Sequence, residues 1–237
     1  MKFKYFFLLL CSAMVFLLGC GDITPKGELA LRSEKVDSFS QMHLEGNYRV
    51  FYVLGKENAV EVETYQNIAD NLSLNVRNHT LEIKEKRKVA GNDFYNVTIY
   101  SSRPIEKIHL KDQVELTLSS AIQSPSLRLE LEGNSKFIGA VSSEQLELQM
   151  KELSRANLTG KSRYAELKIR DTAHIIAPYH RIEVLDLDAQ NGSYTEVYAV
   201  DTLKGRLQNT AKLLYYNSPV SRLKSEPSVR IENKKLD

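Results

Sequence analysis

The sequence predicts an all-β fold, in which a β-helix-like coil of rungs about 18–21 residues long follows an N-terminal region of separate strands. Two observations carry this expectation. From Val36 onwards, short alternating runs rich in β-branched and aromatic residues are separated by Gly, Asn and Asp. In the second half of the chain, such runs recur at a nearly constant spacing.

The N-terminal region, residues 36–104, contains the separate strands. A long helical period of 3.6 residues is absent, although the segment Asn67–Asn71 suits a single helical turn. The clearest strand runs are Tyr48–Val53, Ala59–Glu63, Leu72–Val76, Leu81–Ile83 and Asn96–Tyr100.

The stacked rungs occupy residues 105–219, and a weak first copy starts at Ile108. In the five clear rungs, nine of the ten residues at the first and third positions are apolar, and all ten at the second and fourth positions are polar. Antiparallel hairpins also alternate, but spacings of 19, 21, 18 and 18 residues favour a coil. The rungs begin at Leu127, Leu146, Leu167, Leu185 and Leu203.

Charges at the second rung position are expected to form a column on the outer face, with neighbouring rungs about 4.8 Å apart. Opposite charges in such a column contribute about 0.2–1 kcal/mol for each pair. A slip of one residue would turn every charge inward, so the pattern fixes which face is buried. The column predicted to alternate in sign is Arg128, Glu147, Lys168, Asp186 and Lys204.

Each rung is followed by a short polar segment that suits a turn. Gly, Asn and Asp tolerate positive φ, and Ser and Thr bond back to the backbone. The predicted turns are Glu132–Ser135, Glu152–Ser154, Asp171–Thr172, Asn191–Ser193 and Asn209–Thr210.

Residues 1–19 read as an export signal, with Lys2 and Lys4 before an apolar run too short to span a bilayer. Leu17-Leu18-Gly19-Cys20 resembles a lipobox, in which the thiol receives diacylglycerol before cleavage. The alternative is an ordinary secretory peptide with a chance cysteine. We expect lipid on Cys20, followed by a flexible tether over residues 20–35.

Cleavage would discard Cys11 and leave Cys20 as the one cysteine, so neither a disulfide nor cysteine catalysis is expected. The signal also removes two of the 32 basic residues, which leaves 30 basic against 30 acidic residues. A near-neutral chain offers no electrostatic case for binding nucleic acid.

The strand and turn segments resemble the putative auto-transporter adhesin, head GIN domain family of bacterial envelope proteins. The resemblance covers about Val36 to Pro219, although most of the family's turn glycines are replaced here. It implies a right-handed β-helix-like fold and supplies no catalytic residues. The matching segments are Gly46–Val50, Ala59–Glu63, Leu72–Ile83 and Asn209–Pro219.

Enzymatic signals are weak. Asp186 and Asp188 are two residues apart on one outer face and are the only candidates for an acid–base pair on a glycan. Flanking Lys and Arg residues favour structural ion pairs instead, so no catalytic residue is assigned. The flanking cations are Lys168, Arg170, Lys204 and Arg206.

The five histidines lack the spacing of metal ligands, so neither a metal nor a cofactor is predicted. His174 and His180 share a rung, but both are expected to be surface imidazoles. The remaining three are His43, His79 and His109.

Tyrosine provides the one suggestive surface feature, since the chain has 12 Tyr and no Trp. Four of these fall at offsets 12 and 13 from their rung starts, where they would form a platform for sugar rings or a partner protein. The alternative is an aromatic ladder packed beneath the C-terminal tail. The four are Tyr179, Tyr198, Tyr215 and Tyr216.

Together these features predict a non-catalytic, lipid-anchored envelope protein that binds or adheres through exposed strand faces. Its expected partners are the membrane and a glycan or surface protein. The alternatives are a glycan-active β-helical enzyme and a structural envelope protein without a soluble ligand. We expect residues 220–237 to cap the coil, and Asp171-Thr172 and Asp201-Thr202 resemble sites of envelope O-glycosylation.

Overall fold

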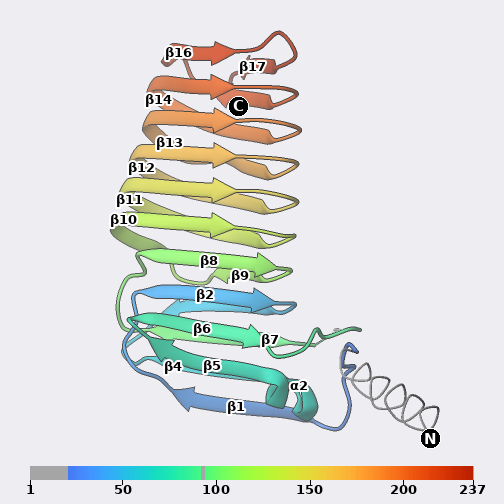
Figure 1. The fold of residues 1–237 in the computed structure, drawn as a ribbon. Helices are drawn as coiled ribbons and strands as arrows, with labels where there is room; N and C mark the ends of the chain where they lie inside the picture. The colour runs from blue at the N-terminus through green and yellow to red at the C-terminus, as the bar shows by residue number, and fades with distance from the viewer. Residues whose placement is uncertain (1–20, 92–93, 237) are drawn as a thin grey trace, which may run out of the picture.

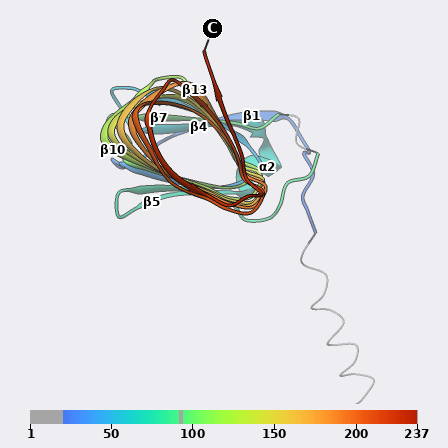
Figure 2. The ribbon, with the colours of Figure 1, turned by 90° about the horizontal axis from the view of Figure 1, so that it is seen from above.

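A computed structural model, which describes residues 21–91 and 94–236, folds as a right-handed β-coil that rises from the N-terminal to the C-terminal end (Figure 1). The predicted β-helix-like fold is therefore confirmed. Seen along its axis, the coil is a flattened oval with two long sides (Figure 2). Each side is one sheet, and we call these sheet A and sheet B.

Sheet A has its strands parallel except at its N-terminal edge, where β5 is antiparallel to β6. Its spatial order is β5 (Leu72–Arg77), β6 (Thr80–Glu85), β2 (Gln41–Gly46), β8 (Lys107–Asp112), β10 (Ile122–Leu131), the second halves of four long strands, and β16 (Val220–Ser225). The long strands are β11 (Lys136–Met150), β12 (Arg155–Ile169), β13 (His174–Ala189) and β14 (Tyr194–Leu207).

Sheet B contains the first halves of the same long strands, because each of them bends around one end of the oval. Its order is β1 (Leu29–Lys35), β4 (Ala59–Tyr65), β7 (Asn96–Ser101), β3 (Arg49–Leu54), β9 (Glu115–Leu118), β11 to β14, β15 (Lys212–Tyr216) and β17 (Arg230–Lys234).

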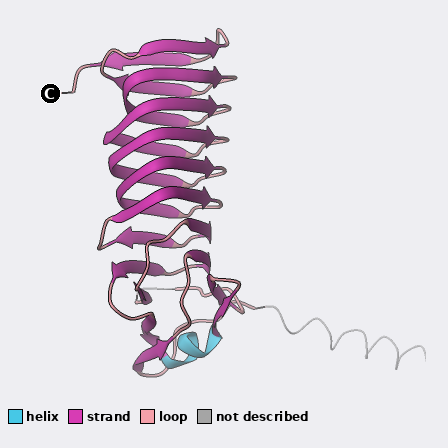
Figure 3. Ribbon diagram, turned by 90° about the vertical axis from the view of Figure 1, so that its left-hand side faces the viewer, coloured by secondary structure: helices cyan, strands magenta, loops and turns pink. Residues whose placement is uncertain are grey.

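The strands of the N-terminal region also belong to the coil. The coil made by β2 and β3 lies between the one made by β6 and β7 and the one made by β8 and β9. After β3 the chain therefore returns through β4 and β5 to the N-terminal end of the coil, and it then ascends from β6. The predicted helical turn is α2 (Gln66–Asn71), the one helix among the described residues, and it covers the N-terminal end (Figure 3).

The expected tether and the expected cap both contain strands. The tether predicted for residues 20–35 is wrong over Leu29–Lys35, because β1 pairs along its whole length with β4. Ile23 also forms a bridge with Val89. Within the expected cap, β16 and β17 stack on β14 and β15 as a further coil that continues the inward pattern with Leu223 and Val229, and its capping role stays a prediction.

The inward columns are as regular as the sequence implied, but two rung starts were misplaced. Leu146 pairs with Ala165, so Leu167 stands at the third position of its rung and not at the first. Ile108 similarly pairs with Leu129. Since the error is two residues, the buried face is unchanged. The first inward column is Leu127, Leu146, Ala165, Leu185 and Leu203, and all five are fully buried.

The predicted turns are confirmed, and they stack at the end of the oval where each coil passes from sheet A to sheet B. One residue of each turn has positive φ, between 56° and 70°. The turns also bond to one another: Asp171 Oδ2 accepts from Glu152 N at 3.1 Å, and Asn209 Nδ2 donates to Asn191 Oδ1 at 2.9 Å. The residues with positive φ are Gly133, Glu152, Asp171, Asn191 and Asn209.

Candidate functional site

A groove of about 550 Å³ runs along the end of the oval opposite the turns, where the long strands bend from sheet B to sheet A. It crosses five coils, from β10 to β14. With coils about 4.8 Å apart, this corresponds to a length of roughly 19 Å along the coil axis. We call it the corner groove, and its lining residues are Gln123–Pro125, Ser142–Glu144, Lys161–Arg163, Arg181, Glu183 and Val200.

The floor of the corner groove is a column of buried serines. Ser124, Ser143 and Ser162 are register partners in β10, β11 and β12, and none is more than 8% exposed. A small side chain fits the inner side of a sharp bend, and a hydroxyl can find a hydrogen-bond partner there. Ser143 Oγ lies 2.9 Å from Ser162 Oγ, and Ser124 Oγ donates to the Ser126 carbonyl at 2.8 Å.

In β13 the register partner of Ser162 is Ile182, so the serine column ends there, and a bulge lies just before it. Ala177 pairs with Val197, and Arg181 pairs with Tyr198, so three residues of β13 have no counterpart in β14. The bulge turns Tyr179 outward, where it is 62% exposed, and His180 inward, where it is fully buried. Bulges re-aim side chains in this way and are frequent beside functional sites.

The prediction that His180 is a surface imidazole is therefore wrong, because the bulge turns this side chain into the coil. His174 does lie on the outer surface, with its ring 5.7 Å from that of Tyr194. The two histidines of this rung point to opposite sides of the strand and do not meet.

His180 fixes the direction of the hydrogen bonds along the floor. Burial lowers its pKa, so the ring is neutral. Because the Thr159 carbonyl can only accept, His180 Nδ1 must donate to it at 3.0 Å. His180 Nε2 then accepts from the Ser162 hydroxyl at 2.9 Å, and Ser162 in turn accepts from Ser143. Ser143 Oγ is left as an acceptor for a donor group in the groove.

Ser162, His180 and the Thr159 carbonyl stand in the order of a nucleophile, a base and an orienting acceptor. A neutral carbonyl, however, stabilises an imidazolium far less than the carboxylate of a catalytic triad does. Ser162 is also only 2% exposed. The arrangement is better suited to holding the bend and presenting an acceptor than to attacking a substrate.

The rim of the corner groove is charged. Arg163 lies between Glu144 at 3.8 Å and Glu183 at 3.9 Å, and all three side chains are more than half exposed. Exposed pairs of this kind contribute about 0–1 kcal/mol, so a ligand can replace them at little cost. Near the upper end, the Arg181 guanidinium lies 5.0 Å from the centre of the Tyr198 ring.

The four predicted tyrosines do not stack as a platform. Tyr198 and Tyr216 are register partners, and Tyr216 donates to Glu196 at 2.8 Å. Tyr215 lies opposite Val197 and packs against the core. Tyr198 is the register partner of Arg181, which lines the corner groove, and Tyr179 precedes Arg181 by two residues, so part of the predicted surface adjoins the groove.

Asp186 and Asp188 lie on the outer face of sheet A, as predicted, and both form ion pairs. Asp186 is 3.2 Å from Lys204, and Asp188 is 3.3 Å from Arg170. The outer column is not strictly alternating, because Glu147, Glu166 and Asp186 are consecutive register partners. The misplaced rung start explains this difference.

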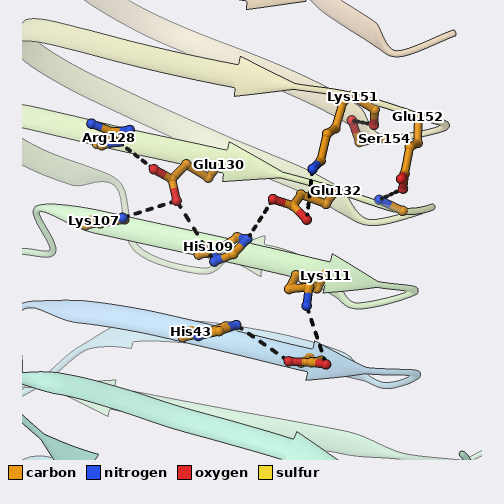
Figure 4. Close-up of polar contacts among 12 residues, drawn as sticks. His43, Lys107, His109, Lys111, Arg128, Glu130, Glu132, Lys151, Glu152 and Ser154 are labelled. Carbon is orange, nitrogen blue, oxygen red and sulfur yellow. Dashed lines mark hydrogen bonds and ion pairs between the residues drawn. The ribbon is translucent and has the colours of Figure 1, made fainter. Parts of the chain in front are cut away.

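A histidine pair that the sequence did not reveal lies lower on sheet A. The rings of His43 in β2 and His109 in β8 stack with their centres 4.5 Å apart. Figure 4 shows His109 between Glu130 and Glu132, which lie 3.9 Å and 3.3 Å from its ring nitrogens. Among the described residues, no three acidic, histidine or cysteine side chains are placed to hold a metal ion.

The predicted signal peptide of residues 1–19 and the predicted acylation site Cys20 lie outside the described residues. Within the described ranges, no helix has the length and apolar character needed to cross a membrane. Thr172 is exposed in its turn and Thr202 is half-buried in β14, so glycosylation of either stays a prediction.

Comparison with known proteins gives a family and a fold. The sequence profile described as "Putative auto-transporter adhesin, head GIN domain" matches residues 38–219. A putative adhesin from Bacteroides fragilis has a TM-score of 0.81 at 19% identity, covering 90% of this chain and 100% of its own. A putative lipid binding protein from Parabacteroides distasonis has a TM-score of 0.73 at 15% identity, with coverages of 91% and 100%. No curated protein sequence matches.

Proposed function

Since the chain belongs to the putative auto-transporter adhesin, head GIN domain family, we propose that it is a non-catalytic adhesion module of the cell envelope that binds an extended ligand in the corner groove. The groove itself is the observation that carries this proposal. It crosses five coils and has a floor of buried polar groups with a fixed hydrogen-bond direction. Such a shape suits a glycan or peptide that runs across the strands.

The geometry favours binding over catalysis. The carboxylates that would act on a glycan, Asp186 and Asp188, are held in ion pairs, and Ser162 is buried beneath the groove. The strands β10, β11 and β12 pass the same bend in continuous register, so the bulge that places His180 under the groove is not required to turn the chain.

We also propose that lipid on Cys20 anchors the chain. The described chain starts at the N-terminal end of the coil, beside α2 (Figure 1). The corner groove begins at β10, beyond the coils made by β6 and β7, β2 and β3, and β8 and β9. An anchor at Cys20 would therefore hold the groove away from the membrane, where a ligand can reach it.

Filling the groove tests this function. Ser142→Trp places an indole over the serine floor from a partly exposed position, whereas Asn157→Trp places one on the exposed face of sheet B. On a glycan array and on beads that contact epithelial cells, we expect Ser142→Trp to weaken binding about tenfold or more and Asn157→Trp to leave it unchanged. Equal binding by wild type and Ser142→Trp would exclude the groove as the ligand site.

A further inference from the structure

A second hollow, of about 490 Å³, lies on the outer face of sheet A towards the C-terminal end. It is formed by β12, β13, β14 and β16, and it shares no lining residue with the corner groove. Two features distinguish it from the rest of this face: it contains cations without acidic partners, and it contains a buried carboxylate oxygen without a donor.

The cations are Arg206, Arg222 and Lys224. All three side chains are exposed, and within residues 21–91 and 94–236 none of them forms an ion pair. Their register increases the local positive charge, because Arg222 pairs with Lys204 and Lys224 pairs with Arg206. Like charges directly opposite each other destabilise a sheet, so folding alone does not favour this arrangement.

The lower end of the same face shows the contrast. There Glu130 lies 3.1 Å from Lys107, Glu132 lies 3.3 Å from Lys151, and Glu45 lies 3.5 Å from Lys111 (Figure 4). In that region each of these carboxylates has a cation beside it. The residues that line the hollow, by contrast, include five cations and three carboxylates.

The carboxylate oxygen is Oδ1 of Asp188. It is buried and has no hydrogen-bond partner, whereas Oδ2 accepts from Arg170 at 3.3 Å. A buried acceptor left without a donor costs about 1–3 kcal/mol. The Asp188 side chain is 34% exposed as a whole, so a hydroxyl group of a ligand in the hollow would remove that cost once this side chain rotates.

We infer that this hollow binds an acidic polysaccharide. The acid groups of the glycan pair with Arg206, Arg222 and Lys224, and a ring hydroxyl donates to Asp188. Neutral glycans lack the first interaction. Double-stranded DNA carries acid groups as well, but its backbone has no free sugar hydroxyl along its length, so it lacks the donor for Asp188. This inference does not depend on the corner groove.

The test compares the chain from Gly21 onwards with the double variant Arg222→Glu, Lys224→Glu on immobilised heparin and polygalacturonate, with dextran as the neutral glycan. We expect wild type to bind both acidic glycans and not dextran, with an affinity that falls as salt rises. The double variant should lose about tenfold or more of that affinity.

Folding and binding should respond in opposite directions. The carboxylate introduced by Lys224→Glu faces Arg206 across the ladder, so the double variant should melt at or above the wild-type temperature while it loses the glycan. The matched control is Lys56→Glu, Arg77→Glu, which changes net charge equally at exposed positions in the N-terminal half. This control should bind as wild type does.

Three results would overturn the inference. Equal loss in the control variant would mean that binding follows net charge alone. If dextran bound as tightly as heparin and polygalacturonate, the acid groups would have no role in binding. Tighter binding to double-stranded DNA or to phosphatidylglycerol vesicles than to either glycan, lost in the double variant, would assign the hollow to a different ligand.

Discussion

Replacing Gly205 by alanine is expected to destabilise the protein by about 2–6 kcal/mol, the largest effect of any single methyl group that we anticipate. Gly205 occupies an inward column with φ of +124°, and an added Cβ would lie 2.1 Å from the carbonyl oxygen of Leu187. Both the backbone conformation and the contact are unavailable to alanine. Thermal unfolding should show a decrease in Tm on the order of 10 °C.

Gly192→Ala is the matched control. Gly192 lies in a turn of the same stack, its φ is outside the left-handed region, and an added Cβ would lie 3.4 Å from the Thr172 methyl group and 3.6 Å from the Asp171 carbonyl oxygen. Its effect should be within about 0.5 kcal/mol. Similar melting temperatures for the Gly205→Ala and Gly192→Ala variants would show that β14 and β13 leave room for a Cβ atom at Gly205.

Replacing His180 by alanine is expected to cost about 2–5 kcal/mol. The change removes the acceptor of the buried Ser162 hydroxyl and the donor to the Thr159 carbonyl, and it leaves a cavity beneath the corner groove. His174→Ala, in the same strand but on the outer surface, should change stability by less than about 1 kcal/mol. Urea unfolding of the two variants gives the comparison directly.

The contribution of His180 should also depend on pH. Burial lowers its pKa in the folded state below the unfolded value, so protons bind preferentially to the unfolded chain. The stability that His180 provides is therefore complete above about pH 6.5 and is lost as pH falls through the lowered folded pKa. The difference between wild type and His180→Ala should shrink between pH 7.5 and pH 5. A difference that grows on acidification would contradict a buried neutral imidazole.

The sequence predicted the buried face of the coil because alternation has a period of two, so an error of two residues leaves every side chain on its correct side. For this reason the inward columns are correctly predicted, although Leu167 was assigned to the first position of its rung and stands at the third. The stacked turns were also predictable, since their Gly, Asn and Asp residues mark positions of positive φ. Ala165 was missed because alanine carries little pattern information.

Non-local features were beyond the sequence pattern. The insertion of β6 and β7 below β2 and β3, and the contact of His43 with His109, join residues that no local period connects. The bulge of β13 breaks the alternation, and so it hid the burial of His180. One signal for the groove was present: Ser124, Ser143 and Ser162 recur every 19 residues at a buried position.

Protease shaving of intact cells tests the central claim, that this coil is displayed at the cell envelope to bind an external ligand. The account predicts that the domain disappears from shaved cells while a periplasmic marker protein survives. Full protection of the domain until the cells are lysed would contradict adhesion and would place the corner groove in contact with a partner inside the envelope.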